Sequence, residues 1–174
     1  HEDQPEFAIT YNNLGAAYSE KGEYDKAIEY HEKALAIKMK TIGPDHPSVA
    51  ISHENIGEVE RIKGEYDKAV EHHQKALEIR VKVLGSNHPM VASSYSSLGT
   101  NYQKKGEFDK AIEYHKKGLN IQQQTIGLNH PDVATTYNVI GQAHLGKGDL
   151  HKAIECFETS LAILLKASGP EHPD

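Results

Sequence analysis

Histidine and cysteine are the side chains of this 174-residue sequence with the clearest capacity for chemistry. Four of the 12 histidines recur at intervals of 42 residues, and these are His46, His88, His130 and His172. If the repeated segments stack as helical units, equivalent positions lie about 10 Å apart. A zinc ion needs its nitrogen ligands about 2 Å away. We therefore interpret these four histidines as structural residues of a turn before proline, not as a shared metal site.

The other reactive side chains also favour structural roles. His72 and His73 are adjacent, so on a helix they point in different directions and are poorly placed to share an ion. The sequence around Cys156 shows neither the base nor the electropositive setting that a catalytic thiolate requires. No Gly-x-Ser-x-Gly, Walker-type loop or His-Glu-x-x-His motif occurs. We predict no catalytic residue, no metal site and no cofactor, and hence a protein that is not an enzyme.

The overall composition argues against two classes of partner. Lys and Arg number 19 against 25 Asp and Glu, which gives a net charge of −6 without any basic block, so we predict no nucleic-acid binding. No apolar run approaches the length of about 18 residues that a membrane-spanning helix needs, so we expect no membrane insertion. The single cysteine cannot form an internal disulfide, which favours a reducing, cytoplasmic location.

The elements that position these residues repeat with a period of 42. Twelve of the 14 glycines fall on three series with this spacing, and five of the seven prolines fall on a fourth. Glycine and proline interrupt helices, so their regular placement indicates equal structural units. We divide the chain, as a single domain, into repeat 1 (residues 1–42), repeat 2 (43–84), repeat 3 (85–126) and repeat 4 (127–168). Residues 169–174 then begin a truncated fifth repeat.

Each unit predicts two helices. In repeat 2, Pro47 suits the first turn of a helix, where its missing N–H group is not needed. No further proline occurs before Gly64, a residue type that commonly ends a helix. A second helix is expected from about Tyr66 to Leu84. Apolar residues recur in both segments at helical spacing, and no segment alternates with the period of a strand. Gly57 lies inside the first helix, where it costs about 1 kcal/mol relative to alanine, so we expect close helix packing there. The sequence therefore predicts an all-α chain of stacked helix-turn-helix units.

The residues of one unit resemble the tetratricopeptide repeat. The first unit carries Tyr11, Leu14, Gly15 and Tyr18, followed by Gly22, Tyr24, Ala27 and Ala34. The 42-residue length and the Gly-x-Asp/Asn-His-Pro linker are similar to the kinesin light chain type of this family. The resemblance implies a right-handed α-solenoid, or superhelix. At the family's second-helix aromatic position stand His31, His73 and His115, which we interpret as packing residues, with a pH-sensitive role as the alternative.

The resemblance also implies where a partner binds. In tetratricopeptide arrays the first helix of each unit lines a concave groove, and the inward positions here vary from unit to unit and are rich in polar residues. The predicted groove residues are Asn12, Asn13, Glu54, Asn55, Glu58, Arg61, Ser96, Thr100, Gln103, Asn138 and Gln142. Amides and hydroxyls can hydrogen-bond an extended peptide backbone whatever its sequence.

We therefore expect a non-catalytic scaffold that binds a peptide segment of a protein partner, as an adaptor does. The alternative is a structural or self-associating array within a larger signalling or sensor protein. Its contact would be end to end, through the last helix and its apolar residues Ile154, Phe157, Leu161, Leu164 and Leu165. A repeat protein engineered as a scaffold is a third reading, which the irregular fourth unit and the diverse groove disfavour.

Overall fold

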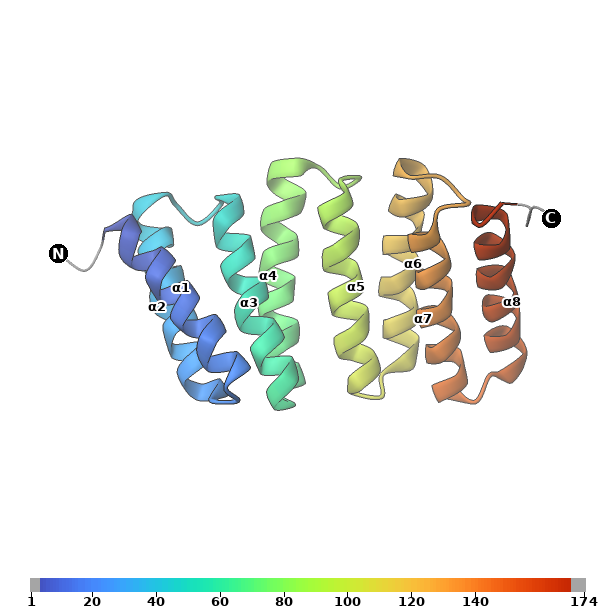
Figure 1. Ribbon diagram of the computed structural model, residues 1–174, viewed down its shortest axis with the longest axis horizontal. Coiled ribbons are helices and arrows are strands. Elements are labelled where there is room, and N and C mark those ends of the chain that lie inside the picture. Colours follow the sequence, from blue (N-terminus) through green and yellow to red (C-terminus); the bar gives the residue numbers. More distant parts are fainter. Residues whose placement is uncertain (1–3, 170–174) are drawn as a thin grey trace, which may run out of the picture. The chain divides into compact units, whose positions relative to one another are not determined.

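The computed structural model describes residues 4–169, which form eight α-helices and no strand (Figure 1). The helices are α1 (Pro5–Glu20), α2 (Tyr24–Thr41), α3 (Pro47–Lys63), α4 (Tyr66–Leu84), α5 (Pro89–Lys104), α6 (Phe108–Thr125), α7 (Pro131–Lys147) and α8 (Leu150–Ala167). Consecutive helices pack in pairs, and each pair is a hairpin that begins 42 residues after the previous one. The predicted all-α solenoid of helix-turn-helix units is confirmed. Residues 170–174, with His172 and most of the predicted fifth repeat, lie outside the described residues.

The chain divides into two compact units between Ser86 and Asn87. In the first unit, α2 packs against α3 and thereby joins the first two hairpins; in the second, α6 packs against α7. Each unit has its own apolar core. The core of the first unit includes Leu35, Val49, Ala50, Ile56, Ala76 and Ile79. The core of the second includes Ala111, Ile112, Leu119, Val133, Ala134, Ile140, Ala143 and Ile163.

The turns before α3, α5 and α7 show what the periodic histidines do. The Nδ1 atom of His46 accepts a hydrogen bond of 3.1 Å from the backbone amide of Ser48, at the N-terminus of α3. His88 and His130 cap α5 and α7 in the same way, also at 3.1 Å. The amides at a helix start have no partner within the helix, so such a cap stabilises it by about 1 kcal/mol. These three histidines are therefore N-caps, each followed by a proline that suits the first turn.

The glycines inside the first helices make room for a ring from the second helix. A Cβ atom built on Gly99 would lie 2.7 Å from the imidazole of His115, which is buried. The equivalent pairs are Gly15 with His31, Gly57 with His73, and Gly141 with Phe157. The expected close packing at these glycines is thus contact with a buried ring. The half-buried ring of Phe157 belongs to this packing, whereas the other residues predicted for an end-to-end contact are exposed, and these are Ile154, Leu161, Leu164 and Leu165.

Within residues 4–169, every helix is too short or too polar to cross a bilayer.

Candidate peptide-binding groove

The predicted groove residues of the first hairpins are largely engaged in contacts of their own. The side-chain oxygen of Asn12 accepts a hydrogen bond of 3.0 Å from the amide nitrogen of Asn55, which links α1 to α3. The same oxygen lies 3.1 Å from Nδ1 of the buried His31 on α2, which donates to it in the matching tautomer. Burial lowers the pKa of His31, so this imidazole stays neutral. Asn12 and Asn55 therefore tie three helices together, whereas Asn13 is exposed.

Glu54 is neutralised by a cation that the sequence analysis did not identify. The guanidinium of Arg80 on α4, only 5% exposed, forms two hydrogen bonds with the Glu54 carboxylate, one of them 2.5 Å long. Burial raises the pKa of Glu54, and the charge of Arg80 opposes that rise. Arg80 lies 26 residues after Glu54, on the other helix of the same hairpin, so local spacing gave no signal of the pair. This carboxylate is already occupied within the fold.

Glu58 and Arg61 form a second ion pair on the surface of α3. They are three residues apart, so a single helical turn brings them together. Arg61 lowers the pKa of Glu58. The two charges offset one another locally and leave little net charge on this part of the face.

In the second unit, Ser96 and Thr100 of α5 line a pocket of about 240 Å³ in which polar side chains alternate with exposed aliphatic carbon. The rest of its lining comes from α6 and α7 and consists of His115, Gln122, Asp132, Thr135, Thr136 and Val139. The hydroxyl of Thr136 donates a hydrogen bond of 2.7 Å to the side-chain oxygen of Gln122. The hydroxyl of Thr100 donates to the backbone oxygen of Ser96 at 3.0 Å. The pocket thus offers hydroxyl and amide groups held in fixed positions by three helices.

The structure brings only some of the predicted groove residues together. Gln103 and Asn138 are half-buried and Gln142 is exposed, and none of the three lines this pocket. Sequence reasoning missed Gln122 and Thr136, which take part in the pocket from the second helix of one hairpin and the first helix of the next. The sequence contains only a weak indication of this pair. The equivalent positions in the first unit are Lys38 and Ser52, and the Lys38 ammonium donates a hydrogen bond of 2.8 Å to the Ser52 hydroxyl.

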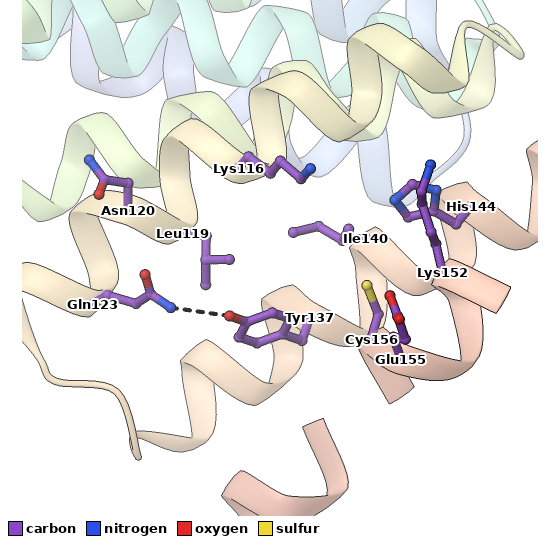
Figure 2. A pocket seen from close by; sticks show the side chains of 10 residues that line it. All are labelled: Lys116, Leu119, Asn120, Gln123, Tyr137, Ile140, His144, Lys152, Glu155 and Cys156. Carbon is purple, nitrogen blue, oxygen red and sulfur yellow. Dashed lines mark hydrogen bonds between the residues drawn. The ribbon is translucent and has the colours of Figure 1, made fainter. Parts of the chain in front are cut away.

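A separate pocket of about 320 Å³ lies between α6, α7 and α8 (Figure 2). Its lining includes Tyr137, His144 and Cys156, and Gln123 donates a hydrogen bond of 3.3 Å to the Tyr137 hydroxyl. Burial raises the pKa of the Cys156 thiol, which disfavours the reactive thiolate. Among the side chains of residues 4–169, no three His, Cys, Asp or Glu groups are placed to hold a metal ion together.

Comparison with known proteins places this architecture in a family. Three overlapping segments, residues 6–80, 48–124 and 97–166, match the family model of the tetratricopeptide repeat. A crystal structure of BtubC (BKLC) from P. vanneervenii is similar over 98% of this chain and 68% of its own, with 28% identity and a TM-score of 0.86. A putative kinesin light chain from Podospora anserina with nearly identical repeats is similar over 98% of this chain and 81% of its own, with 27% identity and a TM-score of 0.85.

Two further comparisons complete this picture. MamA shares 25% identity over 94% of this chain and 81% of its own, with a TM-score of 0.69. No curated protein matches the sequence significantly. The helix pairs, their 42-residue spacing and the family match together show that this chain belongs to the tetratricopeptide repeat family, with kinesin light chain-like repeat proteins among its structural neighbours.

Proposed function

We propose that this chain is a non-catalytic, cytoplasmic scaffold that holds an extended peptide segment of a protein partner against its first helices. Tetratricopeptide repeats in general are protein-interaction modules, and the finer assignment rests on one observation, the pocket lined by Ser96, Thr100, Gln122 and Thr136. Its hydroxyl and amide groups suit the alternating donors and acceptors of a peptide backbone. The helices fix these groups before binding, which spares the scaffold an ordering cost.

The contacts within the first unit help to decide which residues we propose to bind the peptide directly. Asn12 and Asn55 already bond to each other, and Glu54 is held by Arg80. We therefore assign direct peptide contact to the exposed Asn13 and to Ser96 and Thr100, and a supporting role to Asn12, Glu54 and Asn55. Glu58, Arg61, Gln103, Asn138 and Gln142 remain further proposed contacts.

The test is peptide-library selection followed by affinity measurement on variants. Thr100→Val together with Ser96→Ala should weaken the selected peptide by at least about tenfold, since two hydrogen-bonding groups are lost. Thr159→Val is the matched control, because the Thr159 hydroxyl also bonds its own helix, at 2.8 Å to the Glu155 oxygen, and lies outside the pocket. Selection of no peptide, or equal binding by the double variant and the control, would remove the groove from consideration.

One observation favours self-association as a second candidate function. Leu161 of α8 is 57% exposed, whereas Leu119, its equivalent on α6, is 8% exposed beneath α7. Ile154, Leu164 and Leu165 are exposed on the same helix. End-to-end packing through α8 predicts sedimentation that shifts with concentration in the wild type and not in Leu161→Glu. A concentration-independent monomer in both rejects this candidate.

A further inference from the structure

A trio of tyrosines packs in the first hairpin of each compact unit. In the first hairpin, the rings of Tyr18 and Tyr30 stack with centroids 5.3 Å apart and an angle of 6°, and Tyr11 lies 6.0 Å from Tyr30. The third hairpin repeats the arrangement with Tyr95, Tyr102 and Tyr114, again with a stacked pair at 5.3 Å and 6°. These three positions are therefore ordinary aromatic packing sites of the hairpin.

The second hairpin fills the same three positions with His53, Glu60 and His72. The Nδ1 atoms of His53 and His72 are 3.0 Å apart, at hydrogen-bonding distance, and Nε2 of His72 lies 3.9 Å from Oε1 of Glu60. Glu60 is only 4% exposed, and its Oε2 atom has no hydrogen-bond partner among residues 4–169. An unpaired carboxyl group buried in this way is costly, so its presence requires an explanation.

Glu60 faces a pocket of about 460 Å³ between α2, α3 and α4. Glu60 is two residues beyond Glu58, about 200° further around the helix. The pocket thus opens on a different face of α3 from the proposed groove, and it does not depend on the proposed peptide function.

The charges around this pocket leave an excess of carboxylates. Its two lysines are already paired: Lys63 contacts Asp25 at 2.7 Å and Glu65 at 2.6 Å, and Lys68 contacts Glu65 at 2.5 Å. The remaining acidic groups of the lining are Glu32, Glu60 and Glu71. Within residues 4–169, none of these three carboxylates has a lysine or arginine at ion-pair distance.

The titration of the buried groups agrees with a site that favours a cation. Burial raises the pKa of Glu60 to about 7; Lys68 opposes this rise, and the carboxylates of Glu65, Glu32 and Glu71 add to it. Burial lowers the pKa of His72 to about 4, and the neighbouring His53, Lys75 and His73 contribute. The His72 imidazole is therefore neutral at pH 7 and adds no positive charge to this cluster of carboxyl groups.

We propose that this pocket binds the guanidinium group of an arginine side chain from a protein partner, with Glu60 as the buried anchor. A guanidinium carries five N–H donors in a plane and matches carboxylates pairwise, so it can bond Glu60 while reaching Glu32 or Glu71 at the mouth. Its weak hydration and its tendency to stack on flat rings suit a half-buried site beside the His72 imidazole. The ammonium of a lysine is more strongly hydrated and has no flat face to stack.

The corresponding pocket of the second unit provides an internal contrast. It carries Lys116 and His144 at the positions of Glu32 and Glu60. Lys116 repels a cation and no buried carboxylate replaces Glu60 in that pocket, so binding should be confined to the first unit.

The experiment uses the full chain and two peptides that differ only in charge. The peptides are acetyl-Gly-Arg-Gly-amide and the same peptide with citrulline, the neutral isostere of arginine. In amide NMR titrations the arginine peptide should shift resonances around Glu60 and His72 and bind at least about tenfold more tightly than the citrulline peptide, because only the former carries the charge. Equal binding of the two peptides overturns the proposal.

Two variants localise the effect. Glu60→Gln keeps the shape of the side chain and should reduce arginine-peptide affinity at least about tenfold, whereas Glu29→Gln, which removes an exposed carboxylate paired with Lys33, should leave it unchanged. Undiminished binding by Glu60→Gln overturns the proposal. If that variant does not fold, Glu32→Gln together with Glu71→Gln at the exposed mouth decides, because the proposal requires this double variant to weaken arginine binding and not citrulline binding.

A proton readout separates this site from nonspecific attraction to acidic surface. Burial raises the pKa of Glu60 to about 7, so its carboxyl group is partly protonated near neutral pH and a bound cation should expel protons from it. Calorimetry in two buffers of different ionisation enthalpy measures this release, which Glu60→Gln should abolish. Arginine binding without proton release in the wild type contradicts the assignment of Glu60 as anchor.

Discussion

The same substitution, glycine to alanine, is expected to have opposite effects at two positions of the third hairpin. In a helix interior alanine is favoured over glycine by about 1 kcal/mol, so both Gly99→Ala and Gly118→Ala gain that amount from the backbone. The difference lies in what the new methyl group meets. At Gly99 it would lie 2.7, 2.7 and 2.8 Å from three ring atoms of the buried His115.

At Gly118 the methyl group would meet a single tight contact, which is relieved when its neighbour moves by a few tenths of an ångström. Its nearest neighbour would be the backbone oxygen of Ala92 at 3.1 Å. The equivalent positions in the first and second hairpins are Ala34 and Ala76, both fully buried. In the fourth hairpin Ser160 occupies this position and donates a hydrogen bond of 2.8 Å to the Ala134 oxygen, so a Cβ fits against the equivalent carbonyl.

The two changes should therefore differ in sign. Overpacking a buried ring costs about 1–3 kcal/mol, and three contacts below 3 Å place Gly99→Ala at the upper end of that range. After the helix gain, Gly99→Ala should lower the free energy of unfolding by about 1–2 kcal/mol, whereas Gly118→Ala should raise it by about 0.5–1 kcal/mol. Urea denaturation followed by circular dichroism at 222 nm measures both on the same scale.

A double-mutant cycle identifies the ring as the cause. In a His115→Ala background the imidazole is absent, so adding Gly99→Ala should stabilise the protein instead of destabilising it. Gly99→Ala that stabilises the wild-type chain as much as Gly118→Ala does would refute the packing argument. The argument would also be refuted if Gly99→Ala still lowered the free energy of unfolding in the His115→Ala background.

Two further predictions concern buried polar groups. Burial lowers the pKa of His73 to about 4, against about 6.5 in an unfolded chain, so acidification protonates the unfolded state first. The contribution of His73 to stability should fall by about 3 kcal/mol between pH 6.5 and pH 4, whereas Glu60, whose pKa is raised to about 7, contributes in the opposite direction. Urea titrations at several pH values should therefore be compared between the wild type and His73→Phe, and the free energy of unfolding of the wild type should lose about 3 kcal/mol more than that of the variant over this range. Arg80→Met leaves the half-buried Glu54 carboxylate without its cation and should cost about 1–3 kcal/mol, much of which Glu54→Gln in the same chain should restore. Equal unfolding free energies of Arg80→Met and the double variant would contradict the second prediction.

The sequence was sufficient for the architecture because the determinants of helix boundaries are local. Pro47 and Gly64 mark the two ends of α3, and the structure begins and ends that helix at Pro47 and Lys63. The glycine inside the helix also pointed correctly to close packing. The ring that packs against Gly57 belongs to His73 on the other helix of the hairpin. We predicted a packing role for His73, and its burial supports that prediction.

The site was harder to predict because its chemistry depends on contacts between helices. Spacing places Glu54 on the groove face, but only the folded hairpin shows that Arg80 reaches it. Glu60 stood at an apolar position of the helical pattern, where the neighbouring hairpins carry Tyr18 and Tyr102. That mismatch was the available signal, whereas the pocket beside Glu60 is formed by residues of three helices and could not be located from the sequence of α3 alone.

The tyrosine trios also have a practical consequence for spectroscopy. The chain has nine tyrosines and no tryptophan, and the two trios account for six of the nine. One trio lies in each compact unit. Rings held in a fixed stack give near-ultraviolet circular dichroism, which disappears when tertiary packing is lost. The protein therefore carries an intrinsic chromophore in each half, and replacing the tyrosines of one trio by phenylalanine would let the unfolding of the other half be followed without an attached label.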